Sequence, residues 1–314
     1  MATAQDALPR TVRIVEVGPR DGLQNEQQPV ATGVKLELIA RLVAAGVATV
    51  EAGSFVSPKW VPQMADSGEV LRRLPRQQGV RYTALVPNLK GFEAAVEAGC
   101  EEVAIFGAAS ETFSRKNINC GIRESLERFL PVLAAASARG VRVRGYVSCV
   151  VGCPYEGPVA PQAAAEVARW LHDHGCYEVS LGDTIGSGTP ASVRAMIEAC
   201  ARVVPIAALA GHYHDTWGMA VANVYASLAL GMSVFDASVA GLGGCPYSPG
   251  ASGNVATEDV VHLLQGLGLD CGIRLDPLVD AAVWISGQLG RPPASKVTQA
   301  TIARRGRAAR DAGT

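Results

Sequence analysis

The sequence predicts a TIM barrel, an eight-stranded parallel (β/α)8 barrel of the α/β class, followed by a short C-terminal helical extension. Three observations support this prediction. First, a chain of 314 residues is long for a single domain but normal for an α/β barrel with an appendage. Second, apolar β-type runs alternate about eight times with segments of helical periodicity. Third, the chain is 48% hydrophobic but only 5% aromatic, so its core must be aliphatic, as in layered parallel sheets.

The expected strands are short runs dominated by Val, Ala, Leu and Ile. They cover residues 12–17, 48–52, 81–86, 102–106, 141–149, 177–181, 206–213 and 234–240. Between the first two, residues 33–45 place Leu36, Ile39, Ala40 and Val43 three or four positions apart. This spacing predicts an amphipathic helix.

Two Ser/Thr-Pro pairs predict helix starts shortly after strands. In Ser57-Pro58 and Thr189-Pro190, a capping hydroxyl precedes a proline at the first helical position. We expect one catalytic domain over residues 1–314, with the barrel at about 12–265, the extension at about 266–297 and a flexible, Arg- and Ala-rich tail at 298–314. An open doubly wound sheet is the competing architecture, but the GxGxxG spacing is absent after the first strand.

Composition and charge favour a small-molecule partner. With 28 basic and 29 acidic residues the formal charge is −1, so no long-range field recruits nucleic acid or an acidic membrane. No apolar segment approaches membrane-spanning length, and the N-terminus lacks a basic start followed by an apolar run. Eight scattered cysteines without a CxxC pair suit a reducing compartment. We therefore expect a cytoplasmic protein.

Polar side chains collect directly after several expected strands. In this fold the carboxyl ends of the strands carry the active site. The polar stretches are residues 18–26, 51–55, 182–190, 212–218 and the glycine-rich loop 241–259. This distribution is typical of a site rather than of a packing layer.

Four of these residues could hold a metal ion. His212 and His214 stand two apart on the seventh expected strand, and the period of two puts both on one face. Asp21 and Asn254 follow the two neighbouring strands and could complete the set, which would suit Mg²⁺ or Mn²⁺. Each has a structural alternative, because Asp21 could cap a turn, His212 could be a satisfied core histidine and Asn254 could cap a helix.

Several charged residues near these positions have both a chemical and a structural interpretation. Arg20 could stabilise an enolate or carboxylate oxygen, or form a salt bridge to Glu16, Glu51 or Asp183. Glu51 and Asp183 could orient an arginine or a histidine, or be purely structural.

Two further features of the chain bear on chemistry. Arg142 and Arg144 alternate with valines in the fifth expected strand, so we expect one or both to point into the barrel. Cys245 lies in the glycine-rich loop, whose Gly and Pro residues indicate a shaped backbone. It is either a small buried apolar residue or a reactive thiol.

Together the motifs resemble the 3-hydroxy-3-methylglutaryl-CoA lyase family from about residue 12 to about residue 290. They match in order and spacing, and are VEVGPRDGLQNE (15–26), EAGSFVSPKWVPQM (51–64), KNINC (116–120), GYVSCVVGCPYEG (145–157), GDTIGSGTP (182–190), HYHDTWGMA (212–220) and GLGGCPYSPGASGNVATED (241–259). The resemblance implies a metal-dependent TIM barrel that cleaves this acyl-CoA into acetyl-CoA and acetoacetate.

The resemblance also implies roles for individual residues. The implied ligands of Mg²⁺ or Mn²⁺ are Asp21, His212, His214 and Asn254. The implied catalytic residues are Arg20 for the enolate, Cys245 as acid-base thiol on a mobile loop, and His212, Asp183, Glu51 and Glu258. Candidates for binding coenzyme A are Lys116, Asn117 and Arg144. The lack of a transit segment and of a peroxisomal C-terminal tripeptide points to a bacterial type.

Three alternatives remain open at this stage. The chain could be a lyase for a longer 3-hydroxy-3-alkylglutaryl-CoA, or a Claisen-type synthase that joins an acyl-CoA to a 2-keto acid. Such synthases usually carry a longer C-terminal region than this chain of 314 residues. A non-catalytic binding barrel is the third alternative. In each case we expect a small-molecule partner and a homodimer.

Overall fold

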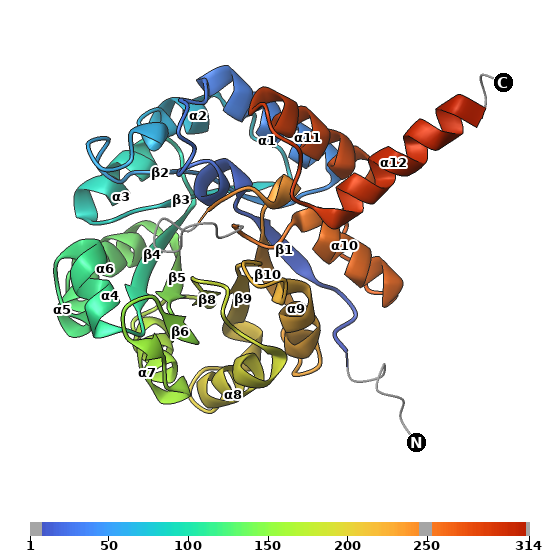
Figure 1. Cartoon of the computed structure of the whole chain (residues 1–314). Coiled ribbons are helices and arrows are strands. Elements are labelled where there is room, and N and C mark those ends of the chain that lie inside the picture. Colours follow the sequence, from blue (N-terminus) through green and yellow to red (C-terminus); the bar gives the residue numbers. More distant parts are fainter. Residues whose placement is uncertain (1–7, 245–252, 312–314) are drawn as a thin grey trace.

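The computed structural model describes residues 8–244 and 253–311, and these form the expected closed barrel (Figure 1). All pairings between barrel strands are parallel, in the order β1-β10-β9-β8-β5-β4-β3-β2, and β1 pairs with both β2 and β10 to close the ring. The strands are β1 (Arg13–Glu16), β2 (Thr49–Ser54), β3 (Arg81–Leu85), β4 (Glu102–Ala108), β5 (Arg142–Ser148), β8 (Glu178–Asp183), β9 (Leu209–Tyr213) and β10 (Val234–Ala237). The predicted TIM barrel is confirmed.

Helices cover the outer side of the barrel, and only the last of the described helices extends away from it, as Figure 1 shows. They are α1 (Thr32–Ala45), α2 (Ser67–Arg73), α3 (Leu89–Glu97), α4 (Glu111–Ile118), α5 (Ile122–Glu127), α6 (Leu130–Arg139), α7 (Pro161–Asp173), α8 (Pro190–Ala201), α9 (Ala220–Leu228), α10 (Thr257–Gly266), α11 (Leu275–Gln288) and α12 (Lys296–Asp311). A small antiparallel pair, β6 (Gly152–Cys153) and β7 (Gly157–Pro158), follows β5. None of the described helices is long and apolar enough to cross a membrane.

Alternation along the strands separates an aliphatic outer core from a charged barrel interior. On β5, Val143 and Val147 join the large apolar cluster under the helices. Between them, Arg144 is 3% exposed and contacts the interior residues Glu178 and Asp236. Arg142 lies at the start of the strand and pairs with Glu102. Of the two arginines, Arg144 therefore points into the barrel, in agreement with the expectation that one or both would do so.

The C-terminal tail differs from its prediction. Residues 298–311, expected to be flexible, belong to helix α12, which extends away from the barrel in Figure 1. Ala and Arg have high helix propensity. The helix also starts from a tertiary contact, because Ser295 Oγ accepts the Thr298 N–H at 3.0 Å and donates to Asp259 at 2.8 Å.

Three local predictions also need correction. The strand expected at 206–213 starts at Leu209, after a 3₁₀ turn. The strand expected at 234–240 ends at Ala237, and Ala240 adopts a left-handed conformation with φ 60°. Ser57-Pro58 starts a single turn rather than a helix, since Pro62 has no N–H to continue the pattern. Thr189-Pro190 does start α8, with Thr189 in a capping box.

Candidate active site

Asp21, His212 and His214 meet at the carboxyl ends of β1 and β9. Asp21 lies in a π-helical turn, Gly18–Gly22, soon after β1. His212 lies on β9 and His214 just beyond its end, so both imidazoles face the same side. Their Nε2 atoms are 3.3 Å apart, and His212 Nε2 lies 4.0 Å from Asp21 Oδ2. One ligand atom from each of the three residues lies within 4.8 Å of the others.

Asn254 joins this cluster from the far end of the glycine-rich loop. The segment around Asn254 pairs with the end of β9: the Val255 N–H donates to Tyr213 O at 2.9 Å, and Asn254 and His214 form an antiparallel β-bridge. The Asn254 amide then donates to Asp21 Oδ2 at 2.8 Å. The structure thus brings together all four residues expected to hold a metal ion.

The chemistry of this cluster fits a divalent cation. The Nδ1 atom of His212 is paired with Asp236 at 3.1 Å, so its Nε2 can present a lone pair to the centre. Burial and the neighbouring His212 lower the pKa of His214 to about 4, which keeps it neutral. Burial alone would raise the pKa of Asp21, but the charge of the neighbouring Arg20, the largest opposing influence, helps to lower it to about 2. Asn254 Oδ1 is buried and has no hydrogen-bond partner in the described part of the chain.

Arg20 lies beside the cluster and is fixed by two carboxylates. Its Nε donates to Glu51 at 2.5 Å and its Nη1 to Asp21 at 2.6 Å, and the residue is 6% exposed. Tyr146 contributes its ring 5.7 Å from the guanidinium and donates its hydroxyl to Glu51 at 3.3 Å. Of the salt bridges expected for Arg20, the structure contains the one to Glu51. This pair holds a permanent cation at the edge of the candidate metal site.

Asp236 is a site residue that the sequence analysis missed. It is buried on β10 and accepts hydrogen bonds from Arg144 at 2.7 and 3.1 Å and from Ser180 at 2.7 Å, besides pairing with His212. The sequence does contain a signal, because an acid inside the apolar run 234–240 needs a buried partner. Arg144 was expected to contact coenzyme A. In the structure its guanidinium group forms salt bridges to Asp236 and Glu178 inside the barrel.

Two of the other acidic candidates, Asp183 and Glu258, accept hydrogen bonds from backbone N–H groups of nearby loops. Asp183 ends β8 and accepts the N–H groups of Ser187 at 3.1 Å and Gly188 at 2.7 Å, and burial raises its pKa to about 6. Glu258 accepts the Ala240 N–H at about 3.0 Å and the Thr298 hydroxyl at 2.8 Å. Both positions support roles in shaping the loops around the site.

Two of the remaining candidates, Lys116 and Asn117, lie on a helix that contributes nothing to the cluster. Lys116 and Asn117 are exposed on α4, and Lys116 Nζ lies 4.6 Å from the centre of the Tyr155 ring. Helix α4 follows β4, so these residues belong to the face of the barrel that carries the site. Cys245 lies outside the described residues.

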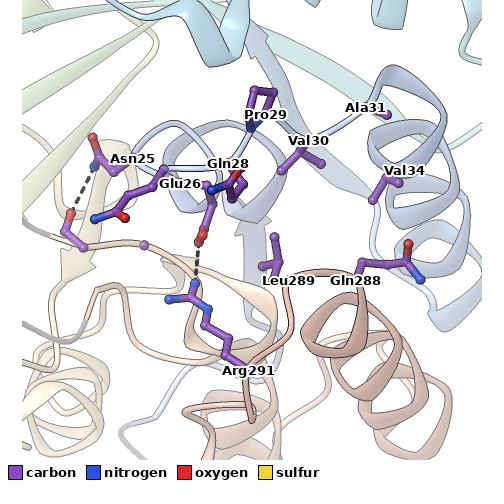
Figure 2. A pocket seen from close by; sticks show the side chains of 13 residues that line it. Asn25, Glu26, Gln28, Pro29, Val30, Ala31, Val34, Gln288, Leu289 and Arg291 are labelled. Carbon is purple, nitrogen blue, oxygen red and sulfur yellow. Dashed lines mark hydrogen bonds and ion pairs between the residues drawn. The ribbon is translucent and has the colours of Figure 1, made fainter.

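A cavity of about 670 Å³ adjoins the loop after β1, between α1 and the end of α11 (Figure 2). Asn25 donates to Gly244 O at 3.1 Å, and Glu26 pairs with Arg291 across the cavity. Neither Asp21 nor the imidazoles line it. The cavity is therefore distinct from the candidate metal site, although the chain segment after β1 contributes residues to both.

Comparisons with known proteins show the family of this chain. A family model described as HMGL-like matches residues 11–285. A hydroxymethylglutaryl-CoA lyase from Pseudomonas mevalonii is 61% identical over 95% of this chain and 99% of its own length. A 3-hydroxy-3-isohexenylglutaryl-CoA/hydroxy-methylglutaryl-CoA lyase from Pseudomonas aeruginosa is 60% identical, with the same two coverages.

A solved structure shows the same fold over nearly the whole chain. The crystal structure of hydroxymethylglutaryl-CoA lyase from Pseudomonas aeruginosa superposes with a TM-score of 0.93 at 59% identity, and the match covers 95% of this chain and 99% of the other. The family model, these relatives and the shared fold together show that this chain belongs to the HMGL-like family, among the hydroxymethylglutaryl-CoA lyases.

Proposed function

We propose that this chain cleaves 3-hydroxy-3-methylglutaryl-CoA to acetyl-CoA and acetoacetate, using Mg²⁺ or Mn²⁺ held by Asp21, His212, His214 and Asn254. The observation that carries the proposal is the convergence of these side chains, from three separate strand ends, next to Arg20. Two relatives have names that include hydroxymethylglutaryl-CoA lyase. They are 61% and 60% identical to this chain, and the match covers 99% of each relative's own length.

The reaction needs one proton removed from a tertiary hydroxyl and negative charge accommodated on a thioester enolate as the C–C bond breaks. A divalent ion in this site supplies Lewis acidity to the substrate oxygens when bound. The chain itself supplies Arg20, whose guanidinium opposes the enolate charge. Because Glu51 and Asp21 hold Arg20 in place before substrate arrives, little reorganisation is needed during the reaction.

Protons are handled by residues around this centre. Asp236 keeps His212 in one tautomer, so that its Nε2 stays available at the cluster. Cys245, which lies outside the described residues, is proposed as the acid-base group: its thiol gives a proton to the enolate carbon, and the proton released by the tertiary hydroxyl restores the thiol over the cycle. An unperturbed thiol has a pKa near ~8.5, so at neutral pH it carries a proton and can donate it. Asp183 serves by shaping the loop after β8.

Several finer features belong to the same proposal. Lys116 and Asn117 are proposed to contact coenzyme A, because they are exposed on the face of the barrel that carries the site. We further propose a homodimer and a cytoplasmic location. A relative whose name includes 3-hydroxy-3-isohexenylglutaryl-CoA makes a longer acyl chain the second candidate substrate.

The test is an activity assay with metal-free protein, Mg²⁺ or Mn²⁺, and a panel of 3-hydroxy-3-alkylglutaryl-CoA thioesters. We expect acetoacetate from the methyl compound, and metal dependence that is weakened in Asp21→Ala and His212→Ala. Release of free CoA from acetyl-CoA plus a 2-keto acid, without lyase activity, would support the Claisen-type synthase instead. An unchanged metal optimum in both variants would remove the ligand assignment.

A further inference from the structure

The backbone that leads into the glycine-rich loop contains a residue in an unfavourable conformation. Ala240 has φ 60° and ψ 6°, a left-handed geometry that residues other than glycine rarely adopt. Its side chain is buried and cannot compensate by hydrogen bonding. Such a conformation persists only where surrounding contacts hold it.

Hydrogen bonds at both its N–H and its carbonyl hold the Ala240 backbone. Its N–H donates to both carboxylate oxygens of Glu258, at 3.1 and 3.0 Å. Its carbonyl accepts the Ala294 N–H at 2.9 Å. Glu258 in turn accepts the Thr298 hydroxyl at 2.8 Å, and it is fully buried. Both ends of this residue are thus tied, directly or through Glu258, to the segment 294–298.

The same segment is anchored to the first turn of α10 by a second acid. Asp259 accepts the Ser295 hydroxyl at 2.8 Å and the Val297 N–H at 2.9 Å. The packing is close, since a Cβ on Gly241 would lie 3.1 Å from the Ala294 Cβ. We define residues 294–298 as the clamp. It consists of the entry to α12 and its first residues, which lie far from the metal cluster in sequence.

The backbone held by the clamp leads directly to the candidate metal site. Two residues after Ala240, the Leu242 carbonyl accepts the Asn254 amide at 3.3 Å, and the same amide contacts Asp21 at 2.8 Å. A Cβ on Gly243 would lie only 2.9 Å from Asn254 Nδ2, so this backbone lies against the amide. Any shift of Ala240 therefore moves a wall of the site.

We propose that the clamp is a positioning element of the active site, in which Thr298 and Ala294 fix Ala240 and thereby the position of Asn254. The C-terminal helix is then part of the working enzyme rather than an appendage to the barrel. Thr298 is a positioning residue and touches neither substrate nor metal. The predicted effect of the clamp on turnover rests on the proposed lyase function. Its predicted effect on metal binding does not, because metal binding is measured separately.

The test uses the full chain with Thr298→Val, which keeps the shape of the side chain and removes the donor. Thr298→Ser is the rescue variant. Thr301→Val is the matched control, since Thr301 is buried one turn later on α12 and is not among the clamp contacts. Mn²⁺ binding to metal-free protein is measured by calorimetry, together with kcat, KM and thermal unfolding.

We expect Thr298→Val to weaken Mn²⁺ binding and to lower kcat, each roughly fivefold to tenfold, because a hydrogen bond to the buried carboxyl group of Glu258 is lost. KM should change less than kcat, Thr298→Ser should lie within about twofold of the parent, and Thr301→Val should bind Mn²⁺ normally even if it melts earlier. Thr298→Val that binds Mn²⁺ and turns over like Thr301→Val would overturn the clamp.

A second variant covers the case in which Thr298→Val does not fold. Ser295→Ala removes one tie to Asp259 and leaves Glu258 in place, so a smaller loss of Mn²⁺ affinity supports the clamp and parental affinity overturns it. If the parent protein binds Mn²⁺ but does not cleave the acyl-CoA, the proposed function is wrong. The comparison of Mn²⁺ affinities between variants would still test whether the clamp positions the metal site.

Discussion

Replacing Asp236 by Asn tests whether the barrel interior prepares His212 for a metal ion. The carboxylate is 1% exposed and contacts Arg144, Ser180 and His212. Asn keeps the shape but removes the negative charge, and its one acceptor oxygen cannot replace both carboxylate oxygens, which together accept from Arg144 and pair with His212 Nδ1. The tautomer that presents Nε2 to the cluster would therefore lose the charge that supports it.

The magnitude follows from these contacts. Loss of a residue that orients a metal-bound histidine typically lowers metal affinity 10- to 100-fold, which is about 1.4 to 2.7 kcal/mol. Breaking a buried ion pair costs about 3–5 kcal/mol of stability when the remaining charge is left alone. Arg144 keeps Glu178 at 2.7 Å, so we expect the stability loss at or below the lower end of that range.

The assay measures Mn²⁺ affinity by calorimetry, metal dependence of turnover, and urea unfolding without metal. Ser180→Ala is the control, because it removes a 2.7 Å hydrogen bond to the same carboxylate and leaves Arg144 and His212 in place. We expect that control to bind Mn²⁺ within a few-fold of the parent. A folded Asp236→Asn protein with parental Mn²⁺ affinity would refute the reasoning.

Three further predictions concern other parts of the site. Arg20→Lys should lower turnover by roughly 10²–10³-fold, because one ammonium cannot reproduce the fixed guanidinium, while Mn²⁺ binding stays within a few-fold; equal losses of both would contradict a role in charge stabilisation. Cys245→Ser should lower turnover by roughly 10²-fold or more with an unchanged melting temperature, and near-parental turnover would exclude the thiol from the mechanism. Burial raises the pKa of Glu258 from 4.5 to about 8, so the folded protein keeps a proton that the unfolded chain releases. Stability should therefore fall as pH rises from about 4.5 towards about 8, and Glu258→Gln should flatten this slope in urea unfolding at pH 5.5 and 8; parallel slopes would show that Glu258 does not titrate in this way.

Sequence patterns were sufficient where the physical rule is local or depends on fold class alone. The period of two on β9 predicted that His212 and His214 share a face. The rule that barrel sites lie at the carboxyl ends of strands brought in Asp21 and Asn254, and the structure places all four together. The motif resemblance led to the family that the comparisons show.

Local patterns failed where the outcome depended on contacts made by distant parts of the chain. The tail after residue 298 is polar and Arg-rich, which alone indicates fraying. It is helical because its first turn packs on Glu258 and Asp259. Ala240 likewise carries no sequence signal for a left-handed conformation, since the contacts that hold it come from residues 258 and 294.

By itself, the sequence determined an aliphatic β/α barrel with Asp21, Arg20, His212, His214 and Asn254 at its carboxyl face, because alternation and loop composition depend on neighbouring residues. Only the tertiary structure decided which charges pair. Arg20 pairs with Glu51, Arg144 pairs with Asp236 and Glu178, and segment 294–298 contacts Ala240. The physical reason is that a buried charge or a strained backbone is stabilised by whatever the closed barrel brings within hydrogen-bond distance, and that depends on strand register rather than on sequence neighbours.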